Sequence, residues 1–278
     1  MIRSAALSCA LLLSGALGCA SGVQPVIDVH THPEFGRPDA SPQEFDAQRA
    51  SAGVTFAIGI LHSDDGTLPT PRASNTVFCA GVNASPNLTT LEAGLRDRTY
   101  RCIKVYLGYV PKYAYDDVYE PVYALAEKYD VPVIFHTGDT ASVAAKLKYA
   151  DPLTIDEVAV DHPKVRFVIA HCGNPWIESA AEVAYKNPNV YLDGSALLIG
   201  DMTKLPRDQV RRYVIEPIRW VFGYIENPDK LMFGSDWPLV NIPAYVDAFK
   251  KAIPRPYWNK VFHDNAVRVF KLEDQVRQ

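Results

Sequence analysis

Short apolar segments with the composition of β-strands recur along the chain. Most are nearly continuous in branched and aromatic apolar residues, a pattern typical of parallel strands that are covered on both faces. Eight such segments occur, at residues 26–32, 54–62, 75–83, 100–108, 131–138, 165–173, 189–196 and 230–238. Eight strands joined by helices predict an α/β fold of the (β/α)8 TIM-barrel type.

Most of the connecting segments have the apolar periodicity of amphipathic helices. The segment 41–53 opens with Ser41, and Glu44 follows three residues later, which is a capping box. Helical patterns also occur at 116–130, 153–163, 176–188 and 207–225. The segment 63–74 looks like a loop, so we expect a slightly distorted barrel. An open doubly wound sheet is the alternative, but no glycine-rich phosphate-binding motif follows the first strand.

The first 22 residues differ in kind from the rest of the chain. One arginine precedes an apolar run and then small residues, which predicts a signal peptide rather than a transmembrane helix. The segment ALGCAS resembles a bacterial lipobox with lipidation at Cys19, although Ala16 stands where such motifs prefer Leu. Cleavage after Ala20 is the competing interpretation. We expect an exported periplasmic or membrane-anchored lipoprotein with one barrel domain, residues 23–278.

The composition excludes some classes of partner. The formal net charge is −4 and the pI is about 6.0, and no dense run of Lys or Arg occurs. We therefore expect a small-molecule substrate, no nucleic-acid partner, and membrane contact only through the N-terminal lipid. The oligomeric state stays open. Outside the leader the cysteines are Cys79, Cys102 and Cys172; a Cys79–Cys102 bridge is one interpretation, but we favour buried free thiols.

Titratable side chains gather where the predicted strands end. Five of the seven histidines fall there. In a barrel of this kind the carboxyl ends of the strands form the active-site face. The residues concerned are His30, His32, His62, Lys104, His136, His171 and Asp236.

Strand geometry indicates which of these side chains share a face. Residues two apart point the same way, so His30 and His32 lie together. Ile103, Val105 and Leu107 would face the helices, which leaves Lys104 inside the barrel. A lone ammonium there is costly and needs a carboxylate, a modification or a lowered pKa. Imidazoles and a carboxylate converging at one rim are typical of a divalent-metal site that activates water.

Each residue taken alone has a structural interpretation. A single His-x-His pair is weak evidence for a metal, and Lys104 could simply pair with Asp28 or Asp236. The joint pattern on separate strands favours the metal site. We interpret His162 and His263 as structural, and the role of His62 stays open, with a substrate contact as one interpretation. Tyrosines that follow the fourth strand fit either the pocket or helix packing: Tyr106, Tyr109, Tyr113 and Tyr115.

The segments DVHTHPE, PVIFHTGD, VIAHCG, MFGSDWP and FHDNAVRVFKL resemble the amidohydrolase superfamily. The likeness is to its amidohydrolase-related branch, which includes aminocarboxymuconate-semialdehyde decarboxylase and lactone hydrolases. It runs from about Val26 to Leu272 and is specific for the fold and the metal, not for the substrate.

The resemblance implies roles for these positions. His30, His32 and His136 would be metal ligands, and Asp236 would bind the metal and move the proton of the attacking water. His171 would bind a second metal or polarise the substrate. Lys104 would bridge two metals if carboxylated; we expect one divalent metal, with Zn²⁺ the first choice and Mn²⁺ an alternative.

Three functions fit these residues. The first is an exported metal-dependent hydrolase that uses a metal-activated water on an amide or lactone. The second is a non-oxidative decarboxylase of an unsaturated or aromatic acid, which needs a cation for the substrate carboxylate; Arg37 and Arg72 are available on early loops. The third is an exported binding lipoprotein without catalysis, which the retention of every candidate ligand disfavours.

Overall fold

Eight parallel strands form one sheet in which each strand pairs with its neighbours in the sequence. The computed structural model describes residues 24–33, 40–69 and 74–276. The predicted signal peptide, Cys19, Arg37 and Arg72 lie outside these residues. The strands are β1 (Val26–Thr31), β2 (Val54–Ile60), β3 (Thr76–Val82), β4 (Tyr100–Val105), β5 (Val133–Phe135), β6 (Phe167–Ile169), β7 (Val190–Asp193) and β8 (Leu231–Met232).

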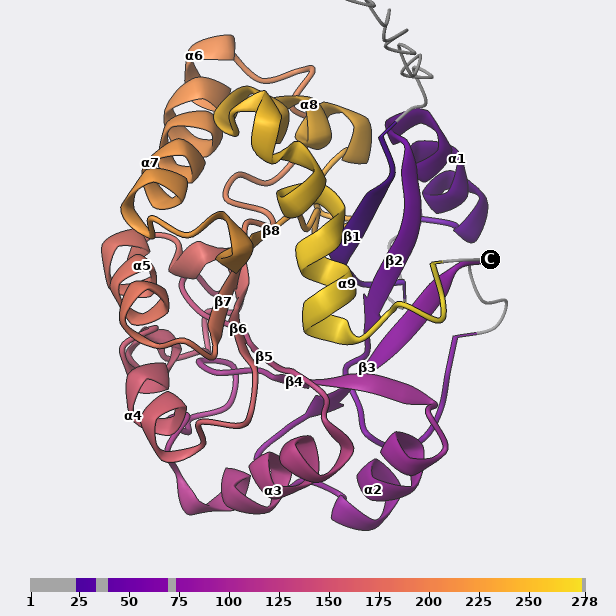
Figure 1. The fold of residues 1–278 in the computed structure, drawn as a ribbon, viewed down its shortest axis with the longest axis vertical. Coiled ribbons are helices and arrows are strands. Elements are labelled where there is room, and N and C mark those ends of the chain that lie inside the picture. The colour runs from indigo at the N-terminus through magenta and orange to yellow at the C-terminus, as the bar shows by residue number, and fades with distance from the viewer. Residues whose placement is uncertain (1–23, 34–39, 70–73, 277–278) are drawn as a thin grey trace, which may run out of the picture.

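The sheet curls into a nearly closed barrel (Figure 1). The amide of Val29 donates to the carbonyl of Phe233 (3.1 Å), and the amide of His32 donates to the carbonyl of Trp237 (2.7 Å). The first strand therefore meets the segment that follows the last one, which confirms the predicted (β/α)8 TIM barrel.

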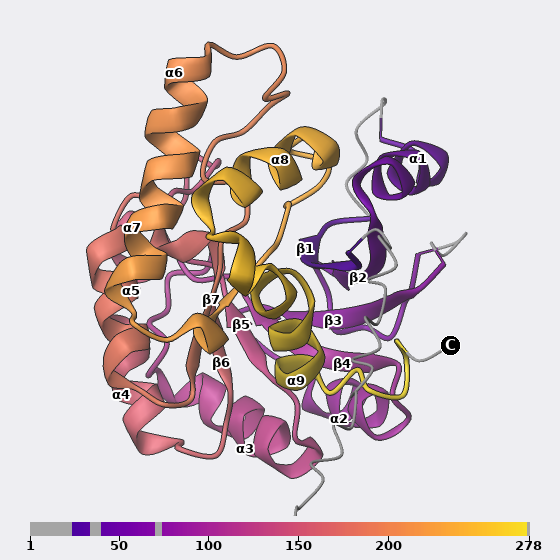
Figure 2. The same ribbon diagram turned by 45° about the horizontal axis from the view of Figure 1, so that its top comes forward.

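Helices surround the strands in both views (Figures 1 and 2). Ser41 caps the first helix by accepting from the amide of Glu44 (3.1 Å), as the capping box predicts. No helix occurs among the described residues between β2 and β3, as expected for the 63–74 loop. The helices are α1 (Pro42–Ala52), α2 (Leu88–Arg96), α3 (Glu120–Tyr129), α4 (Thr154–Asp161), α5 (Ile177–Lys186), α6 (Arg207–Val210), α7 (Glu216–Tyr224), α8 (Ile242–Ala252) and α9 (Asn265–Phe270).

The core has an outer layer between strands and helices and an inner layer inside the barrel. In α9, Val269 and Phe270 pack with the inner layer. The carbonyl of Val269 accepts from Arg166, just before β6, and the Asn265 amide group donates to the carbonyl of Leu231, where β8 begins. Helix α9 thus covers the amino ends of the strands, and the opposite end is left for a site. None of the described helices is long and apolar enough to cross a membrane.

Cys79 and Cys102 form a disulfide, so the expectation of free thiols is wrong for this pair. The register of β3 and β4 places the two residues directly opposite each other, with their Cα atoms 4.3 Å apart. Sequence patterns alone do not give this register. Cys172 is free and buried, as expected.

Candidate active site

The residues singled out at the strand ends come together at the carboxyl ends of the strands. All of them except His30 line a cavity of about 480 Å³. A second cavity of about 370 Å³ adjoins it and shares His136, His171 and Asp236. The residues that line the first cavity are His32, His62, Lys104, Tyr106, Tyr109, His136, Ala141, Ser142, His171, Asp236 and Leu239.

Three buried ligand atoms converge beside this cavity. Oδ1 of Asp236 lies 3.2 Å from Nε2 of His32 and 3.6 Å from Nε2 of His30. The backbone fixes this approach, because the amide of Asp236 donates to the carbonyl of His30 (2.7 Å) while Asp236 holds a left-handed φ of 67°. The two histidines therefore share a face, as strand parity predicts.

The other ring nitrogen of each histidine, Nδ1, contacts a hydrogen-bond acceptor. Nδ1 of His30 lies 2.9 Å from Oδ2 of Asp193, and Nδ1 of His32 lies 3.1 Å from the carbonyl of Ile60. Both partners only accept hydrogen bonds, so Nδ1 carries the proton and the Nε2 lone pairs face Asp236. This is the arrangement of histidines that ligate a metal.

The surroundings of Oδ1 of Asp236 indicate whether a cation fits between these residues. It is buried and has no hydrogen-bond partner among the described residues. An uncompensated carboxylate oxygen beside two imidazole lone pairs is a costly arrangement in a protein interior. A divalent cation would satisfy all three atoms at once, and His30, His32 and Asp236 form a group of the kind that could hold one.

Burial and nearby charges set the protonation of the site. Burial, with the Lys104 charge adding to it, lowers the pKa of His30 to about 3, so this imidazole is neutral. Burial alone would raise the pKa of Asp236, but the neighbouring histidines, His30 first, hold it well below its usual range. A neutral imidazole and an ionised carboxylate are the forms that bind metal.

Lys104 points into the barrel, as strand parity predicts. It is fully buried, and its Nζ lies 3.4 Å from Nε2 of His30 and 5.6 Å from the centre of the Tyr106 ring. Burial lowers the pKa of Lys104 to about 8, although the charges of Asp193 and Asp236 oppose this. Among the described residues no carboxylate oxygen lies within ion-pair distance of Nζ, so neither Asp28 nor Asp236 pairs with it directly.

His136 and His171 form a second pair of imidazoles. Nε2 of His171 lies 3.2 Å from Nδ1 of His136, and Nε2 of His136 lies 2.9 Å from the carbonyl of Asp139. His136 is therefore not part of the group formed by His30, His32 and Asp236 in this structure. Burial lowers the pKa of both His136 and His171.

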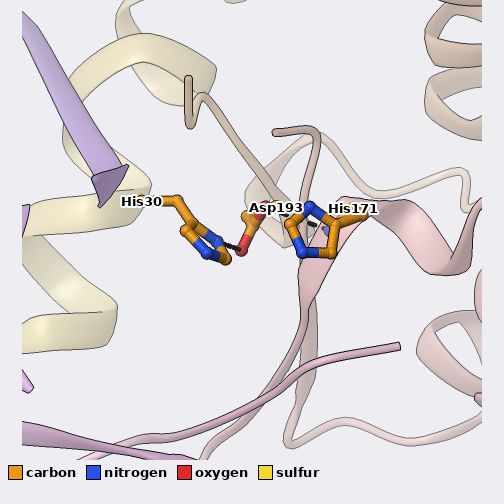
Figure 3. Close-up of side chains that lie close together, drawn as sticks. All are labelled: His30, His171 and Asp193. Carbon is orange, nitrogen blue, oxygen red and sulfur yellow. Dashed lines mark hydrogen bonds and ion pairs between the residues drawn. The ribbon is translucent and has the colours of Figure 1, made fainter. Parts of the chain in front are cut away.

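Asp193 and Ser195 belong to the site, and the sequence pattern did not single them out. Both are fully buried, and Figure 3 shows Asp193 between His30 and His171. Asp193 is the last residue of β7, so it lies at the end of a strand, as the other candidate residues do. Its position after the apolar residues of the segment NVYLDGSA is the sequence signal that could have identified it.

The remaining candidates divide between the pocket and the surface. The His62 ring stacks on Tyr106 (5.5 Å, 12°) at the cavity wall, and Tyr109 packs its edge on His136 (4.8 Å). Tyr113 and Tyr115 stack on each other and are not among the cavity-lining residues.

The two histidines interpreted as structural lie away from this cavity. His162 lies at the end of α4, 3.3 Å from a carboxylate oxygen of Glu120. His263 lies beside Asp264, just before α9.

Solved structures share the fold. An uncharacterized TIM-barrel protein from Bordetella bronchiseptica superimposes with a TM-score of 0.67 at 21% identity, covering 91% of this chain and 100% of that one. A putative 2-pyrone-4,6-dicarboxylic acid hydrolase from Pseudomonas putida gives 0.66 at 15% identity, covering 90% and 99%. A 5-carboxyvanillate decarboxylase from Novosphingobium aromaticivorans, complexed with manganese and a nitrobenzoic acid, gives 0.60 at 12% identity, covering 91% and 97%.

Sequence comparison assigns the family. A search of curated proteins finds no match. The amidohydrolase family model matches residues 69–272, a span that holds Lys104, His136, His171 and Asp236 but begins after His30 and His32. The chain therefore belongs to the amidohydrolase family and is an enzyme of the amidohydrolase superfamily.

Proposed function

We propose that this enzyme is a metal-dependent hydrolase that cleaves an amide or a lactone. The observation that carries the proposal is the convergence of the His30 and His32 Nε2 atoms on Oδ1 of Asp236, an atom without a hydrogen-bond partner among the described residues. A cavity of a size suited to a small molecule adjoins this group, and His32 and Asp236 line it.

His30, His32 and Asp236 would hold the cation. Zn²⁺ is the first candidate because two imidazoles and one carboxylate match its usual catalytic ligands, and Mn²⁺ is the second because a structural neighbour contains it. When bound, the cation supplies the acidity that makes water a nucleophile at neutral pH. Members of the superfamily bind divalent metals, which supports this assignment.

The chain itself supplies the proton transfers and the charge stabilisation. Asp236 accepts the proton of the attacking water and returns it to the leaving nitrogen or oxygen as the C–N or C–O bond breaks. Lys104 and His171 line the same cavity, where their N–H groups can stabilise negative charge on the carbonyl oxygen. Tyr106 and Tyr109 give the cavity its apolar wall.

The charges of the cavity favour hydrolysis over decarboxylation. A decarboxylase needs a cation that holds the substrate carboxylate. Lys104 is the one lysine or arginine among the described lining residues, and its Nζ already lies 3.4 Å from the Nε2 atom of His30 that would bind the metal. Decarboxylation stays the second candidate because the structural neighbours include decarboxylases, and because Arg37 and Arg72 lie outside the described residues. The family assignment disfavours the third function, a non-catalytic binding protein.

We further propose that the enzyme is exported as a one-domain lipoprotein anchored through Cys19. The support is the signal-like composition of residues 1–22. The mass of the N-terminal peptide from membrane fractions tests this, because lipidation adds acyl chains to Cys19.

The experiment strips the purified protein with a chelator, reloads it with Zn²⁺ or Mn²⁺, and screens lactones, amides and aromatic carboxylates. We expect metal-dependent hydrolysis, its loss in His30→Ala, and its retention in the matched control His263→Ala, which changes a histidine near the amino ends of the strands. Release of CO2 without hydrolysis would establish the decarboxylase instead. Less than one equivalent of bound metal with no turnover would refute the proposal.

A further inference from the structure

A single buried carboxylate, that of Asp193, contacts both histidines to which the proposed function gives separate roles. Asp193 is fully buried at the end of β7, between His30 from β1 and His171, which follows β6 (Figure 3). Its two oxygens have different partners, and each oxygen acts on one histidine.

The Oδ2 oxygen acts on the ring of His30. It lies 2.9 Å from Nδ1, and both side chains are fully inaccessible to solvent. Two backbone amides and a hydroxyl donate to the other oxygen of Asp193, so the carboxylate is an acceptor and Nδ1 of His30 is the donor in this contact. The proton therefore stays on Nδ1 of His30, and the Nε2 lone pair faces Asp236.

The Oδ1 oxygen acts on the backbone that carries His171. Three consecutive residues there have left-handed φ values: His171 (58°), Cys172 (46°) and Gly173 (70°). Such a conformation is costly for residues with a Cβ atom and persists only where the surroundings hold it. Oδ1 of Asp193 accepts from the amide of His171 (3.2 Å) and so fixes the start of this turn.

Ser195 completes the contacts of Oδ1. Its amide donates to this oxygen (3.0 Å), and its hydroxyl donates to it as well. The Ser195 hydroxyl oxygen also lies 3.0 Å from Nδ1 of His171. All three donors to Oδ1 are fixed, so the carboxylate has one orientation, with Oδ2 toward His30.

We propose that Asp193 is a positioning residue that sets the tautomer of His30 and the place of His171 together. The inference rests on the proposed function, because it takes His30 as a metal ligand and His171 as the residue that polarises the substrate. The ligand atoms of His30, His171 and Asp193 also lie close enough together to hold a metal ion. We do not assign a second metal site to them, because hydrogen bonds already satisfy both oxygens of the Asp193 carboxylate.

The decisive variant is Asp193→Asn, which keeps the shape of the side chain. Two backbone amides and a hydroxyl donate to the Oδ1 position, so the amide oxygen must occupy it. The NH2 group then faces Nδ1 of His30 and donates to it, which moves the imidazole proton to Nε2. A protonated Nε2 offers no lone pair to a metal, the same tautomer logic that disables the Asp-to-Asn variant of a serine-protease triad.

The experiment measures Zn²⁺ affinity by competition with a chromophoric chelator, together with the ¹⁵N shifts of His30 in metal-free protein. We expect Asp193→Asn to bind Zn²⁺ about 10- to 100-fold more weakly. We expect His30 to be the Nδ1–H tautomer in the wild type and the Nε2–H tautomer in the variant. Asp247→Asn is the matched control; it makes the same change from carboxylate to amide at an exposed position of α8, and we expect the wild-type affinity.

The outcomes separate this inference from the proposed function. Wild-type affinity in folded Asp193→Asn, alongside loss of affinity in His30→Ala, would overturn the role of Asp193 and leave the metal site intact. Wild-type affinity in both variants would overturn the proposed function. An Nε2–H tautomer of His30 in the metal-free wild type would overturn the inference even if Asp193→Asn does not fold.

Discussion

His32 and Asp236 come from opposite ends of the chain, yet Nε2 of the first lies 3.2 Å from Oδ1 of the second. The contact arises because the segment after β8 pairs with β1, where the amide of His32 donates to the carbonyl of Trp237. Closure of the barrel thus creates the proposed metal site. It also leaves one carboxylate oxygen buried without a hydrogen-bond partner among the described residues.

Asp236→Asn tests whether the Asp236 carboxylate binds the metal. The variant keeps the shape of the side chain but replaces a charged ligand oxygen with a neutral amide, which is a weaker ligand for a divalent cation. Metal at 100 times its Kd should stabilise the wild type by about 2.7 kcal/mol and the variant by much less. Urea unfolding with and without Zn²⁺ measures both effects. The exposed control Asp247→Asn should respond to metal as the wild type does, and an equal response in Asp236→Asn would refute the assignment.

The Cys79–Cys102 disulfide should contribute about 3 kcal/mol to the free energy of unfolding. The bridge closes a loop of 23 residues, and a loop of that size restricts the unfolded chain by about this amount. Urea unfolding with and without a reductant measures the contribution. The double variant Cys79→Ala/Cys102→Ala should be insensitive to the reductant, whereas Cys172→Ala should keep the wild-type sensitivity. No effect of the reductant on the unfolding of the wild type would contradict the prediction.

Lys104→Met tests the number of metals. We expect one equivalent of metal in both the wild type and the variant, because the His30, His32 and Asp236 group does not include the lysine. Metal analysis after reloading in the presence of bicarbonate measures the stoichiometry. Two equivalents in the wild type and one or none in the variant would instead show that a carboxylated Lys104 bridges two metals.

The Asp130 carboxylate should make a stability contribution that is lost in acid. Partial burial would raise its pKa, but hydrogen bonds from Lys271 and Arg166 outweigh this and lower the pKa below the usual 3.8. The contribution is therefore present above pH 3.8 and disappears as the pH falls through the lowered value.

Asp130→Asn should accordingly cost about 1 kcal/mol at pH 7 and approach zero cost as the pH falls toward about 2, since the carboxylate is half-exposed. Urea unfolding across this pH range measures the difference. Asp161→Asn, an exposed carboxylate at the end of α4, is the control and should change the unfolding free energy little at either pH. A cost for Asp130→Asn that does not change with pH would show that packing, not charge, is responsible.

The sequence by itself determined the strand order, the barrel and the face on which the site lies. Apolar runs of strand length alternate with helical patterns, and this local information suffices because parallel strands in a barrel share one carboxyl end. Strand parity also placed His30 beside His32 and turned Lys104 inward. Both depend only on the two-residue period of a strand.

The tertiary structure decided what depends on register and on side-chain rotation. The β3–β4 register put Cys79 opposite Cys102, and no sequence pattern gives that offset. Asp193 reaches His30 and the turn of His171 because the closed barrel brings the ends of β1, β6 and β7 together, while His136 turns toward the carbonyl of Asp139. These contacts join residues that are far apart in the chain, and they depend on hydrogen-bond geometry in the buried interior. Only the folded barrel therefore shows which imidazoles face Asp236.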